Sequence, residues 1–270
     1  MKKNKIKKII SILAISCLTL SFIGCGQTSK KETSKIEKIK EKGTIVLGTS
    51  ADYPPYEFHK NINGKDTIVG FDIDIAKEIS KDLGVKLEIK DMKFDGLLAA
   101  LDAGNIDFVI SGMTPTEERA KNVDFSKVYY KANQGIIVRA GDENKYNSVN
   151  DLKGLNIGAQ KGSIQEDIAK KQIPNSNVKS LPKVTDLVLA LTNKKIDAIV
   201  MEEPVAKAYV SNNKSLALTK VEVEDKEGGS AIAAKKGSTD LIKAINATID
   251  KLNKSNKINE FVVEANKLSE

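Results

Sequence analysis

Arginine is scarce in this chain, and one of its two copies lies in a loop suited to binding an anion. Only Arg119 and Arg139 stand against 41 lysines in 270 residues. A chain with this bias is expected to keep Arg where the planar, two-point geometry of the guanidinium matters, as in carboxylate binding. We therefore expect Arg119 to grip a carboxylate. The alternative is a surface ion pair with a neighbouring Glu.

The loop that precedes Arg119 carries the signals of a helix start. Thr114 and Glu117 have the spacing of a capping box, and Pro115 suits the first helical position. This pattern predicts free N–H groups and the positive end of a helix dipole beside the loop. A cation gains little from that dipole, so a purely structural helix has no use for Arg119 one turn inside.

A second loop repeats the capping pattern in the other half of the chain. Ser163 and Glu166 form the pair, with Ile164 between them, and the loop follows an expected strand at 155–159. Alone, this pattern marks only the start of a helix. Paired with the Arg119 loop, it offers a second helix end that favours an anion.

Two adjacent carboxylates, Glu202 and Glu203, precede Pro204 at another expected helix start. One interpretation is that one residue caps the helix and the other is solvated. The functional interpretation places Glu202 in a cleft as the partner of a cation.

Aromatic side chains complete the set of candidate binding residues. Tyr53 and Tyr56 flank two prolines that stiffen the loop after the first expected strand, and Phe94 offers another ring. Core packing is the default role of such rings, but a rigid turn after a strand favours a binding surface. A guanidinium, a carboxylate and stacked rings together suit a zwitterionic α-amino acid.

The elements that must position these residues follow an α/β rhythm. We expect strands at 44–48 and 85–89 and an amphipathic helix at 72–83. A helix–turn–strand pattern at 97–110 recurs ninety residues later at 187–200. Two copies indicate two α/β lobes of similar plan, with ligand-binding loops at the carboxyl ends of their strands. The alternative is a chance similarity of two such units.

The net charge of +7 comes from the N-terminal segment. Residues 1–42 contain 11 Lys and 3 Glu, whereas the rest is close to neutral. A basic start, an apolar run at 9–23 and Gly24-Cys25 predict a lipoprotein signal peptide at 1–25, with Cys25 carrying fatty acids such as palmitate, and a polar tether at 26–40. The alternatives are an ordinary signal peptide or a short N-terminal anchor. Cys17 lies inside the apolar run.

Composition excludes several functions. The neutral remainder has no Trp and no basic cluster, which argues against a nucleic-acid partner. His59 is the only histidine, and no Cys follows Cys25, so a zinc site or a His-based triad lacks its parts. We expect no cofactor and no metal.

Several segments together resemble extracellular solute-binding protein family 3, the amino-acid receptors of bacterial ABC importers. The resemblance covers essentially the whole mature chain, and its segments are 53–58, 70–74, 107–119, 124–130 and 197–204. It implies a periplasmic-binding-protein-like fold with two lobes joined by two extended hinge strands. Lobe 1 is expected at 41–130 and 226–270, and lobe 2 at 134–221.

The resemblance also implies roles for individual residues and for partners. Tyr53 and Phe94 would enclose the ligand side chain, and Arg119 would hold the carboxylate with Thr114, Ser163 and the Ile164 amide. The carbonyl of Ser111 or Gly112 and the side chain of Glu202 would hold the amine. The implied protein is a monomer on the extracytoplasmic face of the membrane that closes on its ligand and delivers it to permease subunits. An enzyme such as a dehydratase, or a sensor module, is the alternative on this fold.

Two departures from the family pattern concern specificity. Ser50 and Glu202 stand where many relatives carry Asp. Loss of the acid at Ser50 weakens the attraction for Lys or Arg, unless Asp52 or Glu203 compensates. Gln160 and Gln165 flank the second capping loop, and they favour a neutral polar ligand such as glutamine or cystine.

Overall fold

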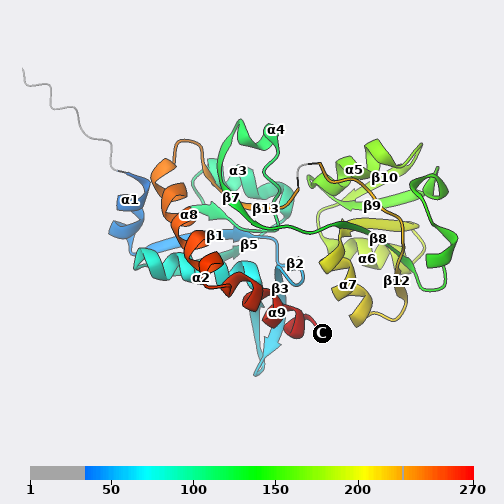
Figure 1. Ribbon diagram of the computed structural model, residues 1–270, viewed down its shortest axis with the longest axis horizontal. Helices are drawn as coiled ribbons and strands as arrows, with labels where there is room; N and C mark the ends of the chain where they lie inside the picture. The colour runs from blue at the N-terminus through cyan, green and yellow to red at the C-terminus, as the bar shows by residue number, and fades with distance from the viewer. Residues whose placement is uncertain (1–33, 227) are drawn as a thin grey trace, which may run out of the picture. The chain divides into compact units, whose positions relative to one another are not determined.

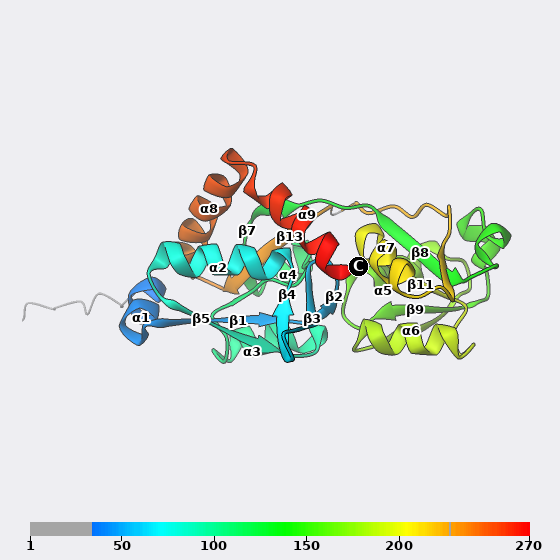
Figure 2. The same ribbon diagram turned by 90° about the horizontal axis from the view of Figure 1, so that it is seen from below.

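The computed structural model describes residues 34–226 and 228–270 (Figures 1 and 2). The expected signal peptide, Cys25 and most of the expected tether lie outside these residues. The helices are α1 (Lys35–Lys42), α2 (Phe71–Leu83), α3 (Leu97–Asp102), α4 (Glu117–Ala120), α5 (Ile164–Gln172), α6 (Val184–Thr192), α7 (Glu203–Asn212), α8 (Thr239–Lys254) and α9 (Lys257–Ser269). The strands are β1 (Thr44–Thr49), β2 (Asp52–Tyr53), β3 (Glu57–Ile62), β4 (Lys65–Val69), β5 (Lys86–Asp91), β6 (Phe108–Val109), β7 (Val123–Tyr130), β8 (Gln134–Arg139), β9 (Asn156–Gln160), β10 (Asn177–Leu181), β11 (Ala198–Glu202), β12 (Leu216–Leu218) and β13 (Ser230–Lys235).

Two five-stranded sheets of the same plan organise the described chain. The first has the order β5-β1-β6-β13-β7, and the second has the order β10-β9-β11-β8-β12. In each sheet four strands run in one direction and a single strand, β13 in the first sheet and β8 in the second, runs in the opposite direction. We call the part built on the first sheet lobe 1 and the part built on the second sheet lobe 2. A small antiparallel sheet, β2-β3-β4, completes lobe 1.

The chain passes between the sheets twice (Figure 1). Residues 131–133 join β7 to β8, and the segment between β12 and β13 returns to the first sheet. The expected two-lobed α/β fold with two crossovers is confirmed.

Helices cover both faces of each sheet because the strands alternate their apolar side chains. On β1, Ile45 and Leu47 pack in the cluster that contains α2 and α8, whereas Val46 packs against α3 on the opposite face. All three are almost completely buried. Full burial of such a side chain contributes about 1.5–3 kcal/mol. In lobe 2, α5 covers one face and α6 and α7 contact the strands as well.

The internal repeat corresponds to one recurring joint in the two lobes. The Asp107 carboxylate accepts the Val46 N–H at 2.9 Å, and the Asp197 carboxylate accepts the Asn156 N–H at 3.0 Å. Each joint also has a glycine that packs against an isoleucine, and the two isoleucines are ninety residues apart in the chain. A Cβ on Gly48 would lie 2.3 Å from Ile106, and one on Gly158 would lie 2.5 Å from Ile196. Larger residues at these two glycines would therefore require the Ile106 or Ile196 side chain to move.

One boundary differs from the expectation. Helix α1 begins at Lys35, so residues 35–40 are not part of a tether. Ser34 caps the helix in a reciprocal capping box with Glu37, and Ile39 is buried against lobe 1. The Lys/Glu-rich composition hid this helix because only one narrow side of it is apolar.

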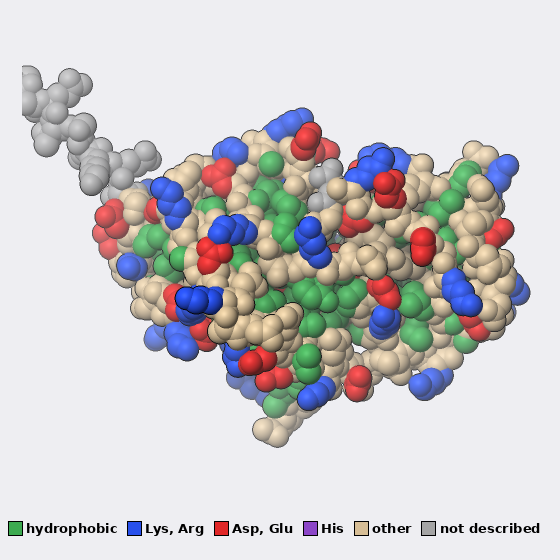
Figure 3. Space-filling view, in the orientation of Figure 1, with side chains coloured by type: hydrophobic (Ala, Val, Ile, Leu, Met, Phe, Trp, Pro, Cys, Tyr) green, Lys and Arg blue, Asp and Glu red, His purple; other side chains and the backbone are tan. Residues whose placement is uncertain are grey.

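Charged side chains of both signs are interspersed over the face drawn in Figure 3. Within the described residues, no helix has the length and apolar character needed to span a membrane.

Candidate functional site

A narrow cavity lies between the two lobes and is lined by residues of both. The cavity is almost closed, with a volume of about 10 Å³. The lining residues are Tyr53, Phe94, Ser111, Gly112, Thr114, Arg119, Gln160, Ser163, Ile164 and Gln165. The structure therefore brings together all of the residues that the sequence analysis singled out for ligand binding except Tyr56 and Glu202.

Arg119 extends from lobe 1 to lobe 2 across this cavity. Its Nη1 donates to the Thr114 carbonyl at 2.7 Å, and its Nη2 donates to the Gly162 carbonyl at 2.8 Å. The guanidinium carbon lies 5.4 Å from the centre of the Phe94 ring, within cation–π range. Among the ion pairs of the described residues, none includes Arg119, so the surface ion pair considered as an alternative is not formed.

The Arg119 charge is kept despite its surroundings. Burial lowers the pKa of Arg119 to about 10, which still leaves the guanidinium protonated near neutral pH. Arg119 is half-buried, its direct hydrogen bonds go to uncharged carbonyls, and the charges of Asp167 and Glu118 offset its burial only in part. The arrangement is therefore suited to an anionic group entering the cavity.

The helix beside Arg119 begins later than the sequence pattern predicted. Thr116, not Thr114, is the N-cap of α4, and its hydroxyl accepts the Arg119 N–H at 3.2 Å. Pro115 accordingly precedes the helix. Two threonines stand two residues apart, and spacing alone does not choose between them. Because α4 has one turn, its dipole contributes little, and Thr114 instead supplies a wall and a carbonyl of the cavity.

Ser163 caps α5 as predicted, but the expected reciprocal bond is replaced by another. The Ser163 hydroxyl accepts the Glu166 N–H at 3.3 Å and donates to the Gln160 carbonyl at 2.7 Å. The Glu166 carboxylate accepts the Gly162 N–H at 2.8 Å and not the Ser163 N–H. The capping loop is thereby fixed at both ends, and Ile164 begins the helix with an amide that has no intrahelical partner.

Glu202 lies outside the cavity lining, at the hydroxyl ends of two tyrosines. Its carboxylate accepts a hydrogen bond from the Tyr56 hydroxyl, and its N–H donates to the Tyr53 hydroxyl at 3.1 Å. Burial, assisted by the charge of Asp72, raises the pKa of Glu202 to about 8. A Cβ on Gly112 would lie 3.3 Å from the Tyr53 ring and 3.5 Å from the Tyr56 ring, so these two rings separate Glu202 from the loop that lines the cavity.

Asp52 makes a contact between the lobes and does not replace the acid missing at Ser50. Its Oδ2 accepts the Val184 N–H at 2.7 Å, at the start of α6 in lobe 2. Burial raises the pKa of Asp52 to about 6. The Tyr209 hydroxyl of lobe 2 donates to the Asp52 carbonyl at 2.7 Å, which adds a second contact at the same place.

Gln160 and Gln165, which the sequence analysis placed beside the second capping loop, line the cavity, and the Gln165 amide donates to Gln134 at 3.0 Å. The sequence analysis missed a pair of acids. Glu57 hydrogen-bonds to Ser111 and Asp72 to Gly112. No spacing rule connects residues on a strand and a helix with a loop 54 and 40 residues away.

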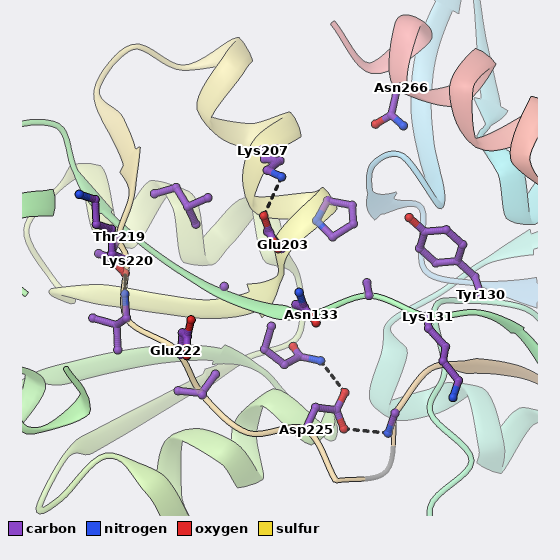
Figure 4. Close-up of a pocket in the computed structure, with 18 residues that line it drawn as sticks. Tyr130, Lys131, Asn133, Glu203, Lys207, Thr219, Lys220, Glu222, Asp225 and Asn266 are labelled. Carbon is purple, nitrogen blue, oxygen red and sulfur yellow. Dashed lines mark hydrogen bonds and ion pairs between the residues drawn. The ribbon is translucent and has the colours of Figure 1, made fainter. Parts of the chain in front are cut away.

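A second cavity of about 960 Å³ lies beside the two crossovers (Figure 4). It was not expected from the sequence. Lys207 and Glu203 point toward one another there and form an ion pair of 2.6 Å. The Gln134 amide donates to Asp225 at 2.9 Å on another side. Glu203 and Lys207 are therefore paired with each other, while Lys131, Lys220 and Glu222 add further charges to the lining. Across the described ranges, no group of His, Cys, Asp and Glu side chains is arranged to hold a metal ion.

The fold has two α/β lobes joined by two crossovers, and the Arg119 guanidinium spans the cavity between them. These features define a two-lobed solute-binding protein. The chain belongs to the bacterial extracellular solute-binding proteins, family 3, whose profile matches residues 45–264. The resemblance stated from the sequence is thereby confirmed.

Relatives of known name show what this chain is similar to. The arginine-binding extracellular protein ArtP of Bacillus subtilis is 37% identical over 97% of this chain and 96% of its own length. The glutamine-binding protein GlnH of the same organism is 33% identical over 94% and 96%. Among solved structures, the amino acid ABC transporter substrate-binding protein AbpA of Streptococcus pneumoniae, bound to L-arginine, has a TM-score of 0.84 and 44% identity. That match covers 86% of this chain and 98% of AbpA.

Proposed function

We propose that this protein captures a free L-amino acid between its lobes and delivers it to the permease of an ABC importer. The observation that carries the proposal is Arg119, a charged guanidinium that spans the cavity without a carboxylate partner. A ligand carboxylate supplies that partner, and the Thr114 and Ser163 hydroxyls and the Ile164 amide surround it. The two carbonyl contacts of Arg119 orient its remaining N–H groups.

The other end of a zwitterion fits the loop below Tyr53. In this proposal the ligand's amine binds to the carbonyl of Ser111 or Gly112. The Glu202 carboxylate joins this amine site when the lobes close around Tyr53 and Tyr56. An ammonium group restores the charged form of Glu202, whose pKa is raised to about 8 by burial. Tyr53 and Phe94 then enclose the side chain. A dissociation constant near 1 μM corresponds to about −8 kcal/mol, which paired charges and ring contacts can supply.

Arginine is the amino acid that we propose as the main ligand. ArtP is named for arginine, and AbpA was solved with arginine bound. Four buried acids, Asp52, Glu57, Asp72 and Glu202, lie outside the cavity lining, and burial raises the pKa of each. Glu57 and Asp72 hydrogen-bond to Ser111 and Gly112 of the lining. A ligand with a second positive charge reduces the repulsion among them. This proposal replaces the preference for a neutral polar ligand that Ser50 suggested.

Glutamine is the second candidate because Gln160 and Gln165 offer amide partners in the cavity lining. Titration calorimetry with arginine, lysine, glutamine, histidine and cystine separates the candidates. We expect arginine to bind at least tenfold more tightly than glutamine. Tighter binding of glutamine or cystine would overturn the choice of arginine and leave amino-acid capture intact. Binding of no amino acid would overturn the proposed function.

We propose in addition that the protein acts as a lipid-anchored monomer and not as an enzyme. Cys25 is the proposed anchor, and the lobes, at 41–130 with 226–270 and at 134–221, would close about the two crossovers. Amino acid incubated with the protein should be recovered unchanged by chromatography. Formation of a product would instead favour a dehydratase-like activity.

A further inference from the structure

Two buried carboxyl groups lie directly beneath the loop that lines the cavity at Ser111 and Gly112. Glu57 on β3 and Asp72 on α2 are both completely buried. The Ser111 hydroxyl donates to Glu57 Oε1 at 2.6 Å, and the Gly112 N–H donates to Asp72 Oδ2 at 2.9 Å. The Tyr129 hydroxyl also donates to Asp72 Oδ2, at 2.8 Å. Each acid therefore holds one residue of this loop.

The second oxygen of each acid has no donor among the described residues. Glu57 Oε2 and Asp72 Oδ1 are buried and accept no hydrogen bond from them. Two ionised carboxylates in this position would repel each other and leave both oxygens unsatisfied, which is costly in a buried site. The two side chains are close enough to hydrogen-bond one another. One proton between them satisfies both oxygens.

The electrostatics agree with a shared proton. Burial and the nearby charge of Asp72 raise the pKa of Glu57 well above its usual value, and burial raises the pKa of Asp72 to about 6. The ionisable groups that face the pair are acids and tyrosines from neighbouring elements: Asp52 and Tyr53 of β2, Tyr56, Tyr129 of β7 and Glu202 of β11. Their charges favour holding one proton at the pair.

We propose that Glu57 and Asp72 share one proton, and that this singly charged pair positions the Ser111–Gly112 loop for the ligand's ammonium group. The inference rests on the proposed function, since only a ligand with an amine uses this loop in that way. Glu57 and Asp72 are positioning residues, because they act through Ser111 and Gly112. Two acids that share a proton titrate as one unit, so neither can be replaced as an independent charge.

Amide substitutions test the shared proton. In Glu57→Gln the new amide donates to Asp72, which keeps its charge. In Asp72→Asn the new amide donates to Glu57, which takes over the charge. We expect each single variant to bind the amino acid within about threefold of the wild type. The double variant has no charge at this pair and two amide donors that face each other. We expect its loss of affinity to exceed the combined loss of the two single variants by at least tenfold.

A ligand analogue without the α-amino group separates positioning from general damage. Its affinity should differ by less than about threefold among all four proteins, and the exposed control Glu88→Gln should change nothing. Single-variant losses that simply add in the double variant would overturn the inference, because independent charges behave in that way. If the double variant lost as much affinity for the analogue as for the amino acid, the inference would also be overturned.

Infrared difference spectroscopy tests whether the pair holds a proton, and it does so without measuring binding and without the double variant. Because Glu202 is itself protonated near neutral pH, the measurement is made in Glu202→Gln, which lacks the Glu202 band. We expect this variant to show the carbonyl stretch of a protonated carboxylic acid, shifted by isotopic labelling of Glu and abolished when Glu57→Gln is added. Absence of this band from Glu202→Gln at neutral pH would overturn the shared proton. If the wild type bound no amino acid, the proposed function would fail, and the band would still decide the proton-sharing part.

Discussion

Replacement of Arg119 by Lys is the most direct test of the carboxylate clamp. The guanidinium donates at once to the Thr114 carbonyl in lobe 1 and the Gly162 carbonyl in lobe 2. A lysine ammonium is a point charge on a flexible stem, so it cannot keep both contacts and also offer two parallel donors to a carboxylate.

The magnitude follows from the contacts that are lost. A hydrogen bond to a charged group is worth about 1.5–3 kcal/mol. Losing one of the two donors to the ligand carboxylate, together with the contact to Gly162, predicts weakening by about 2 kcal/mol or more, which is about 30-fold in Kd. Folding should hardly change, because Arg119 forms no ion pair with the rest of the described chain.

Calorimetry and thermal unfolding measure the two effects separately. Arg139→Lys is the matched control, because Arg139 is the other arginine and supports lobe 2 through Ile196, Asp197 and Asp142. We expect Arg139→Lys to lower the Tm without changing affinity, and Arg119→Lys to do the opposite. Equal affinity of Arg119→Lys and the wild type would refute the clamp.

Four further outcomes follow from the site, the lobes and the N-terminal segment. Because the pKa of Glu202 is about 8 and its usual value is 4.5, binding an ammonium near pH 7 should ionise it and release up to about one proton. Calorimetry in buffers of different ionisation enthalpy should detect this proton in the wild type and not in Glu202→Gln. The same raised pKa should make the ligand-free protein less stable as pH rises from about 4.5 to 8, and Glu202→Gln should lack that loss. Small-angle scattering should give a smaller radius of gyration with ligand, since Arg119 and Asp52 contact both lobes; an unchanged radius at saturation would contradict hinged closure. Mass spectrometry of the mature protein should find fatty acyl groups on Cys25, and a soluble product cleaved elsewhere would rule out the anchor.

The architecture was predictable because its signals are local. The 97–110 and 187–200 patterns combine an apolar helix side, a turn and a buried strand, and each of these features lies within a few residues. The resulting joints at Asp107 and Asp197 show that the two lobes follow one plan. Helix α1 was only hinted at by Ile36 and Ile39, because its apolar side is narrow and its polar composition dominates.

The details of the site depended on contacts that no local pattern contains. The choice of Thr116 over Thr114 as N-cap depends on how the loop meets Arg119. Asp52 was open to more than one role from the sequence, and the structure uses it to hold α6 of the other lobe. The position of Glu202 behind Tyr56 likewise required both lobes. Burial of uncompensated charge is a property of the folded chain, and for this reason the acids beneath the cavity had no signal in the sequence.

The placement of β13 has a consequence for the order in which the chain can fold. This strand lies between β6 and β7 in the first sheet, although residues 131–229 separate it from β7 along the chain. The second sheet, by contrast, uses one continuous segment, and pairing of β12 with β8 brings the two ends of that segment together. Folding of the second sheet therefore shortens the loop that the first sheet must close. Folding of lobe 2 thus brings the two separate parts of lobe 1 close together along the chain. A substitution that slows folding of lobe 2 should therefore also slow folding of lobe 1.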